Sequence, residues 1–190
     1  MAQPVRRALL VFLLPGMVFS PAADPITRTF KSGGQIEMKL EAGEYDILPA
    51  DGDAISVALS GARTDGVRVR LDGTESRTRL SITCTPRSDF RAVIRVPQNC
   101  DLVVRHSAGD LRIGAIRGNK DLRTRAGNLE VMGVDPKDYA HVYASVTAGD
   151  LEARPFNASE GGLFNSFRWT GTGKYELKAK LTAGDLVLKP

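Results

Sequence analysis

The chain has 190 residues, of which 42% are hydrophobic, with 19 glycines, 10 prolines and a formal net charge of +4. This length is enough for one domain with a real core, and the lack of any long window with helical spacing of apolar residues argues against an α-helical fold. The charge is too close to neutral to indicate nucleic-acid binding, so no nucleic-acid partner is expected.

Residues 1–23 are predicted to be an export signal peptide. Arg6 and Arg7 form a positively charged start, residues 8–19 form an apolar segment too short to span a bilayer, and residues 20–23 offer small side chains for cleavage. We therefore expect a secreted protein, periplasmic or at the cell surface, with no transmembrane anchor after cleavage. A short membrane anchor that stays in place is the alternative.

Residues 24–190 are expected to form a single all-β domain, of which residues 24–100 are an irregular hairpin part. Apolar residues alternate along short segments, and turn signals rich in Gly, Asp and Pro separate these segments. The only two cysteines, Cys84 and Cys100, are a candidate disulfide because exported proteins meet oxidising surroundings. Two buried free thiols are the alternative.

Residues 101–190 contain a short repeat centred on a glycine. The run S-A-G-D-L-R-I at 107–113 returns in related form at 125–131, 147–153 and 182–188, and a looser copy lies before this region, at 41–47. Apolar residues alternate on both sides of each glycine, but the phase shifts by one residue across it, which predicts a strand, a corner and a second strand. The expected structural turn residues, rather than ligands, are Gly43, Gly109, Asp110, Gly127, Asn128, Gly149, Asp150, Gly184 and Asp185.

The glycine spacings of 18 and 22 residues favour a β-solenoid, a β-helix-like stack of short strands. Leu111, Leu129, Leu151 and Leu186 would then form an interior ladder, and Arg112 would lie beside Glu130 on the outside. An antiparallel β-sandwich whose hairpins share a turn motif is the alternative.

The insertion at residues 154–173 interrupts these regular rungs. It contains Phe164, Phe167 and Trp169, the only tryptophan of the chain. We favour an end cap that covers the core, and the alternative is an aromatic binding platform.

Charge is distributed unevenly along the chain. Residues 61–125 hold 14 Lys and Arg against 7 Asp and Glu, and some of these basic residues alternate with apolar ones. They could form a basic surface for acidic glycans or phosphorylated headgroups, although we favour a solvated, edge-protecting face.

No catalytic, cofactor-binding or metal-binding residues are predicted. The only histidines, His106 and His141, have no partners at metal-ligand spacing, and the chain contains neither G-x-S-x-G nor S-x-x-K. We expect no cofactor and no enzymatic activity.

The runs Val93–Pro97, Leu102–Val104 and Ser107–Leu111 resemble the bacterial putative adhesin family, over roughly residues 35–190. That family consists of exported β-solenoid-like repeat domains of unknown function, without catalytic residues. The resemblance implies an uncharacterised adhesin-like protein, a non-catalytic binding or structural module of the cell envelope. Its partner is unknown, and envelope glycans or another surface protein are the candidates. The alternative is a carbohydrate-active enzyme on a β-helix scaffold.

Overall fold

The computed structural model describes residues 25–61, 64, 66–86 and 89–190, so the predicted export signal lies outside the described residues. The described residues form fifteen β-strands and two short 3-10 helices, η1 (Pro136–Asp138) and η2 (Arg154–Phe156). The strands are β1 (Ile26–Thr29), β2 (Gln35–Leu40), β3 (Glu44–Ala50), β4 (Ala54–Gly61), β5 (Arg68–Gly73), β6 (Arg77–Thr83), β7 (Phe90–Pro97), β8 (Asp101–Ala108), β9 (Leu111–Ile113), β10 (Lys120–Ala126), β11 (Leu129–Val131), β12 (Tyr139–Ala153), β13 (Ala158–Thr170), β14 (Tyr175–Ala183) and β15 (Leu186–Leu188). Within this part of the chain, no helix has the length and hydropathy needed to cross a membrane.

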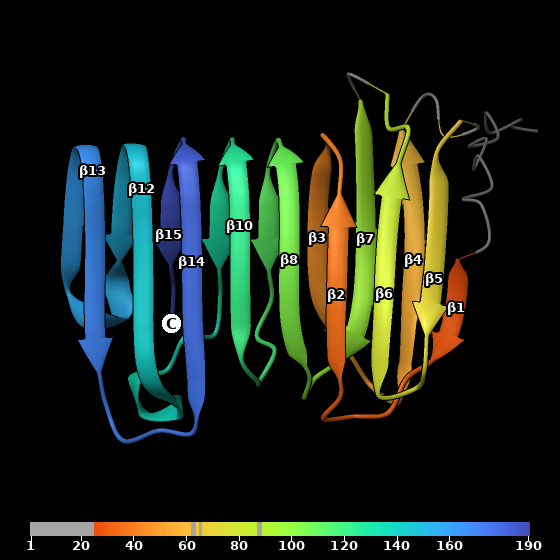
Figure 1. Ribbon diagram of the computed structural model, residues 1–190, viewed down its shortest axis with the longest axis horizontal. Helices are drawn as coiled ribbons and strands as arrows, with labels where there is room; N and C mark the ends of the chain where they lie inside the picture. Colours follow the sequence, from red (N-terminus) through yellow and green to blue (C-terminus); the bar gives the residue numbers. More distant parts are fainter. Residues whose placement is uncertain (1–24, 62–63, 65, 87–88) are drawn as a thin grey trace, which may run out of the picture.

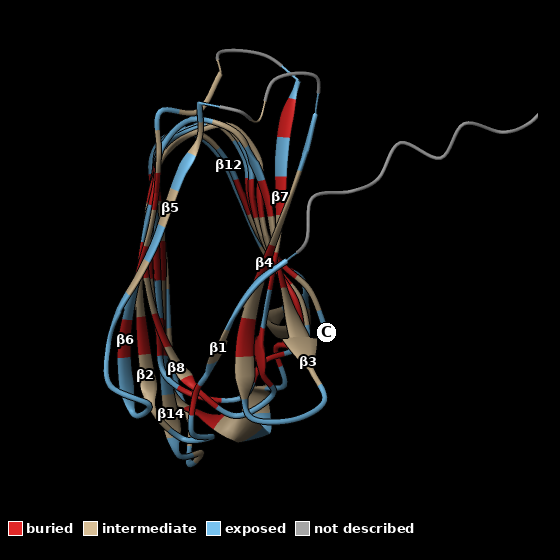
Figure 2. Ribbon diagram, turned by 90° about the vertical axis from the view of Figure 1, so that its right-hand side faces the viewer, coloured by how far each residue is buried: buried red, intermediate tan, exposed pale blue. Residues whose placement is uncertain are grey.

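All fifteen strands belong to one sheet that wraps around the core in two facing layers (Figures 1 and 2). One layer contains β5, β6, β2, β8, β10 and β14, and the other contains β1, β4, β7, β3, β9, β11 and β15. The long strands β12 and β13 bend across both layers. The all-β class is confirmed, and the flattened, nearly closed sheet fits the two-layer alternative in shape.

Strand pairing in the middle of the sheet is parallel, unlike that of an antiparallel sandwich. In one layer β2, β8, β10, β14 and β12 pair in parallel, and in the other layer β3, β9, β11, β15 and β12 do so. Antiparallel pairs lie toward the two ends of the molecule, at β5–β6, β4–β7, β1–β4 and β12–β13. Residues 24–100 are therefore not hairpins alone, because β2 and β3 extend the parallel arrangement.

The repeated glycines occupy the corners between the two layers. Gly127 has φ +105, and a Cβ atom built on it would lie 2.1 Å from the backbone oxygen of Gly109. Only glycine combines this positive φ with so close an approach of two backbones. Equivalent contacts link the corners in the order Gly43, Gly109, Gly127, Gly184 and Gly149.

The inward residue after each corner lies in a ladder across the core. Tyr45, Leu111, Leu129, Leu186 and Leu151 are register partners in that order, and each is at most 1% exposed. The four leucines expected inside are thus buried, but their spatial order differs from their order in the chain. The difference arises because β14 and β15, the last strands, insert between β10–β11 and β12.

The expected outward pair is adjacent but forms its ion pairs elsewhere. Arg112 and Glu130 are register partners on β9 and β11. The Arg112 guanidinium lies 3.7 Å from the carboxylate of Asp46, and Glu130 pairs with Lys189 at 2.9 Å.

The expected disulfide is absent from the structure. Both cysteines are free thiols, with Cys84 exposed and Cys100 buried. Arg77 of β6 and Asp101 of β8 lie level with each other, since both pair with Gln35. Cys100 directly precedes Asp101, whereas Cys84 follows the last residue of β6, roughly 20 Å along the strand from Arg77. A disulfide needs Cα atoms about 4.4–6.8 Å apart, so these positions cannot be bridged.

Candidate functional site

A row of basic side chains crosses the outer face of the layer that contains β2, β8, β10 and β14. The parallel register places Lys39, Arg105, Arg123 and Lys180 directly opposite one another on these four strands, with Ser145 of β12 next in line. Neighbouring strands are about 4.8 Å apart, so the four basic residues span roughly 14 Å, or roughly 19 Å with Ser145 included. Like charges directly opposite one another destabilise a sheet, which makes this alignment costly without a counter-charge.

Asp121 supplies part of that counter-charge. Its Oδ2 accepts a hydrogen bond from Nη2 of Arg105 at 2.8 Å, and its Oδ1 lies 3.5 Å from Nε of Arg123. Partial burial would raise the pKa of Asp121, but the hydrogen bond from Arg105 and the charges of Arg105, Arg123 and Lys178 outweigh it and lower that pKa. Asp121 is therefore ionised at neutral pH and holds the two arginines in the row. Lys39 and Lys180 have no such carboxylate among the ion pairs of the described residues.

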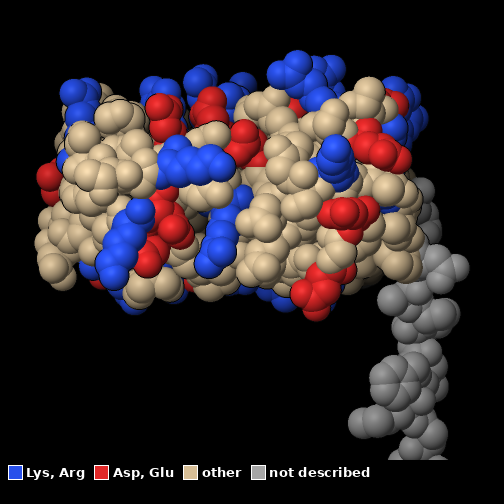
Figure 3. Space-filling model, turned by 90° about the horizontal axis from the view of Figure 1, so that it is seen from below, with Lys and Arg blue, Asp and Glu red and all other residues tan. Residues whose placement is uncertain are grey.

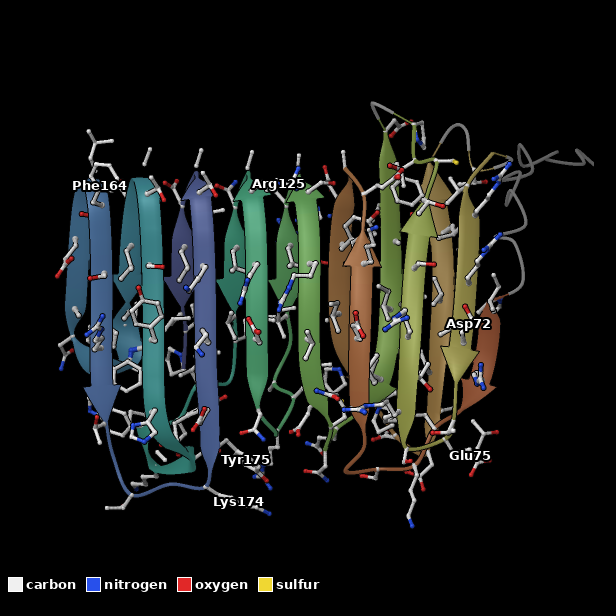
Figure 4. All side chains as sticks on the ribbon, in the orientation of Figure 1. Asp72, Glu75, Arg125, Phe164, Lys174 and Tyr175 are labelled. Carbon is white, nitrogen blue, oxygen red and sulfur yellow. The ribbon has the colours of Figure 1, made fainter. Side chains whose placement is uncertain are left out.

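An open groove of about 760 Å³ lies between this row and the outward residues two positions further along the same strands. The second row contains Glu41, Ser107, Arg125, Thr182 and Thr147. Arg125 projects at the upper end of β10 in Figure 4. On the underside of the molecule, by contrast, basic and acidic residues are interspersed (Figure 3).

The groove lining is strongly basic and rich in hydroxyl groups. It contains five basic side chains and a single carboxylate, Glu41, whose oxygen accepts a hydrogen bond from the backbone N–H of Cys84 at 2.6 Å. Guanidinium and ammonium groups bind anionic oxygens, and hydroxyls both donate and accept hydrogen bonds. The groove is therefore suited chemically to an anionic, hydroxyl-rich ligand.

Sequence reasoning did not identify this cluster. Lys39 and Lys180 lie outside the basic stretch at 61–125 and are far apart in the chain. Their alternation with apolar residues predicted only that each points outward. The parallel register, which aligns β2 with β14 through β8 and β10, brings them into one row.

His106 lies below the groove, within the core. It is 3% exposed, and its ring meets that of Tyr45 edge-on at 5.2 Å between centroids. Loss of solvent lowers the pKa of His106, which favours the neutral imidazole. The described residues contain no group of three or more His, Cys, Asp or Glu side chains arranged to hold a metal ion.

Lys120 is a second buried titratable group, and sequence analysis did not single it out. It is 3% exposed, and its Nζ donates to the hydroxyl of Tyr139 at 2.8 Å and to the carbonyl of Gly118 at 3.3 Å. Burial lowers the pKa of Lys120 to about 8. The alternation of inward and outward residues could have indicated that Lys120 is buried, because Lys120 occupies an inward position beside Leu102 and Leu177.

The polar turn residues bond across neighbouring corners. The side-chain amide of Asn128 donates to Oδ1 of Asp110 at 3.0 Å, and the backbone N–H of Asp150 donates to Oδ1 of Asp185 at 3.2 Å. A structural turn residue would make such bonds.

Three aromatic residues of the insertion, Phe156, Phe167 and Trp169, lie at the end of the core formed by β12 and β13, whereas Phe164 is 79% exposed. The ring of Phe156 is 5.2 Å from that of Phe167 and 5.0 Å from that of Trp169, and all three pack against the core. A Cβ on Gly171 would lie 2.0 Å from the Trp169 ring, so the backbone also covers the indole. These contacts favour an end cap over an aromatic binding platform.

No family model matches the chain, and no curated protein sequence matches it. Among solved structures, the chain is similar to a "putative cell adhesion protein" from Clostridium sporogenes, with a TM-score of 0.54, 8% identity, and coverage of 87% of this chain and 98% of that one. A "putative adhesin" from Bacteroides fragilis aligns over 90% of this chain and 99% of its own, with a TM-score of 0.31 and 9% identity. At this identity, the first likeness shows a shared all-β fold and nothing further.

Proposed function

We propose that this chain is a non-catalytic, adhesin-like module that is exported and binds an anionic glycan of the cell envelope along the basic groove. The observation that carries the proposal is the row of four aligned basic residues, Lys39, Arg105, Arg123 and Lys180. A bound polyanion would relieve the repulsion between these neighbours. The name of the Clostridium sporogenes neighbour agrees with a role in adhesion.

The proposal includes the interpretation of each strand–corner–strand unit as one rung of a β-solenoid. The in-register parallel pairing and the row of corner glycines support it. Rungs that repeat every ~4.8 Å present the same side-chain position at regular intervals. Such a surface matches a ligand whose charges also repeat along a line.

A carbohydrate-active enzyme on the same scaffold is the competing proposal. Glycosidases place two carboxyl groups on either side of the scissile bond. The groove has one carboxylate, Glu41, among its lining residues, and Asp121 beside it is held by Arg105 and Arg123. This lining favours binding without cleavage.

Binding can be measured by titration calorimetry with three probes: polygalacturonate, heparin and neutral dextran. We expect the two anionic polymers to bind and dextran not to bind. Affinity should fall as salt rises, because screening weakens the contribution of the basic row. A parallel measurement with vesicles of phosphatidylglycerol distinguishes a glycan ligand from a phosphorylated headgroup.

Matched lysine variants locate the binding site. Lys39→Ser with Lys180→Ser should weaken binding of the anionic polymer by more than about tenfold, since two charge-assisted contacts are lost. Lys137→Ser, a change of the same type in exposed η1, should leave affinity near that of the wild type. Equal affinity for dextran and the anionic polymers, cleavage of a polymer, or binding to vesicles alone would contradict the proposal.

A further inference from the structure

A second open groove, of about 460 Å³, lies on the same outer face as the basic groove, over strands β12, β13 and β14. Three cationic residues line it, Arg168, Lys178 and Lys180, and its lining residues include no carboxylate. Lys180 also lines the first groove, so the two grooves adjoin. A ligand that follows the basic row toward β12 would therefore reach the second groove.

Tyr143 of β12 lies at the centre of this second groove, between cations of the two neighbouring strands. β12 pairs with β14 on one side and with β13 on the other, and the register places Lys178 and Arg168 directly opposite Tyr143 (Figure 1). The guanidinium carbon of Arg168 lies 5.3 Å from the centre of the Tyr143 ring, and Nζ of Lys180 lies 5.5 Å from it. Both contacts are within cation–π distance, so the ring holds two cations near each other despite their repulsion.

The three cations have no carboxylate partners within the protein. None of the ion pairs of the described residues includes Arg168, Lys178 or Lys180. Asp121 of β10 lies opposite Lys178, but two arginines of the first groove hold its carboxylate. An anion from outside the protein would therefore meet a concentration of uncompensated positive charge.

The surroundings of the Tyr143 hydroxyl also favour negative charge. A hydrogen bond from Ser145, the charge of Lys180, and a hydrogen bond and the charge of Arg168 together lower the pKa of Tyr143. These groups stabilise an anionic oxygen at this position. A phenol with a lowered pKa is also a better hydrogen-bond donor, so Tyr143 is suited to donate to a bound anion.

We propose that the second groove binds a sulfate or phosphate ester of the glycan, with the three cations around the ester oxygens and the Tyr143 hydroxyl donating a hydrogen bond to one of them. The donors come from three adjacent strands, which suits a tetrahedral anion with three terminal oxygens better than a planar carboxylate with two. This inference rests on the proposed function and makes it more specific, because it predicts a preference for esterified glycans over purely carboxylated ones.

The preference can be measured by titration calorimetry with three polymers on the same backbone: carboxymethyl dextran, dextran sulfate and dextran phosphate, with equal degrees of substitution. We expect at least one of the two esters to bind more tightly than carboxymethyl dextran, by about fivefold or more, because only an ester engages the second groove fully. The two ester polymers show which anion is preferred. Equal affinity for all three would overturn this inference and leave the proposed function standing, whereas binding of none would overturn both.

A double variant tests whether the cations of the second groove cause the preference. Arg168→Gln with Lys178→Gln should lower affinity for the preferred ester by about tenfold, and affinity for carboxymethyl dextran by less than about threefold. The matched control is Arg95→Gln with Lys137→Gln, which removes the same two charges from exposed positions outside both grooves and should retain the preference. An equal loss for every polymer in the Arg168 and Lys178 variant would contradict the inference.

Tyr143→Phe separates the hydroxyl from the charge of the groove, because it keeps the ring and changes no charge. We expect affinity for the preferred ester to fall by about threefold or more, with little change for carboxymethyl dextran. Tyr175→Phe is the control, since the Tyr175 ring also lies near a lysine, 5.6 Å from Nζ of Lys174, but lines neither groove. Unchanged ester affinity in Tyr143→Phe would overturn the assignment. Far-ultraviolet circular dichroism shows that each variant is folded.

Discussion

At the scale of single residues, the corner glycines have the most restrictive environment. Gly109 and Gly127 combine φ +105 with a neighbouring backbone oxygen at a distance that no Cβ tolerates. In the sequence, the shift of the apolar alternation across each glycine indicated a corner that needs glycine. The structure adds a second reason for glycine at these positions, which is the stacking of one corner backbone directly on the next.

Gly127→Ala should lower the free energy of unfolding by about 2 kcal/mol or more. The backbone of an alanine is strained at this positive φ, and its Cβ would collide with the Gly109 carbonyl oxygen. Urea denaturation measures the change. Gly66→Ala is the control, since nothing lies within 4 Å of its added Cβ, and its effect should stay within about 0.5 kcal/mol. Equal effects at the two glycines would show that stacking does not constrain the corner.

The buried imidazole of His106 should make stability depend on acidity. Burial lowers the pKa of His106 in the folded protein, whereas the unfolded chain takes up a proton near pH 6.5. The unfolded state then binds more protons, so the contribution of His106 to stability is present above about pH 6.5 and is lost as pH falls below it.

Urea denaturation at pH 8 and pH 5 tests this contribution. His106→Leu should reduce the loss of unfolding free energy between the two pH values. His141→Leu, at an exposed position, should keep the wild-type difference. If both variants behave alike, acid sensitivity originates from other groups.

At the scale of elements, each strand–corner–strand unit places one face in the core and the other in solvent. Leu111 lies between Tyr45 and Leu129 in the core ladder, and Arg112, the next residue, faces outward with a 3.7 Å contact to Asp46. Alternation predicted both orientations from sequence. It could not predict the ion-pair partners, because these depend on which strands become neighbours and on the rotamers of long side chains.

Leu111→Ala should lower the free energy of unfolding by about 2–5 kcal/mol through lost burial and a cavity. Arg112→Ala, one residue away, should cost less than about 1 kcal/mol, since its ion pair is exposed. Denaturant titration of both variants gives the comparison. A larger loss from Arg112→Ala than from Leu111→Ala would mean that the assigned faces of β9 are reversed.

At the scale of the whole molecule, the order of strands departs from the order of the chain. β13 occupies the outer edge of β12, so β14 and β15 pair with the inner edge of β12 and with β10 and β11. The C-terminal strands therefore lie in the middle of the sheet. Most neighbours within the sheet are distant in sequence, which is typical of slowly folding β proteins.

Hydrogen exchange should reveal this central position. We expect the backbone amides of β14 and β15 to exchange as slowly as those of β10, because opening them requires disruption of the middle of the sheet. The amides of β1, an edge strand at the other terminus, should exchange faster. Mass spectrometry of deuterated peptides measures both regions. Equal, rapid exchange in β1, β14 and β15 would place the C-terminal strands at an edge.

The sequence by itself determined the all-β class, the positions of the corners and the inward face of each strand, because alternation and glycine conformation act over a few residues. The tertiary structure alone decided which units became neighbours, since Leu129, Leu151 and Leu186 could be buried equally well in several stacking orders. The same choice of neighbours aligned Lys39 with Lys180, left the outer edge of β13 open and kept Cys84 away from Cys100. These features arise from pairings between distant segments, which no local pattern encodes.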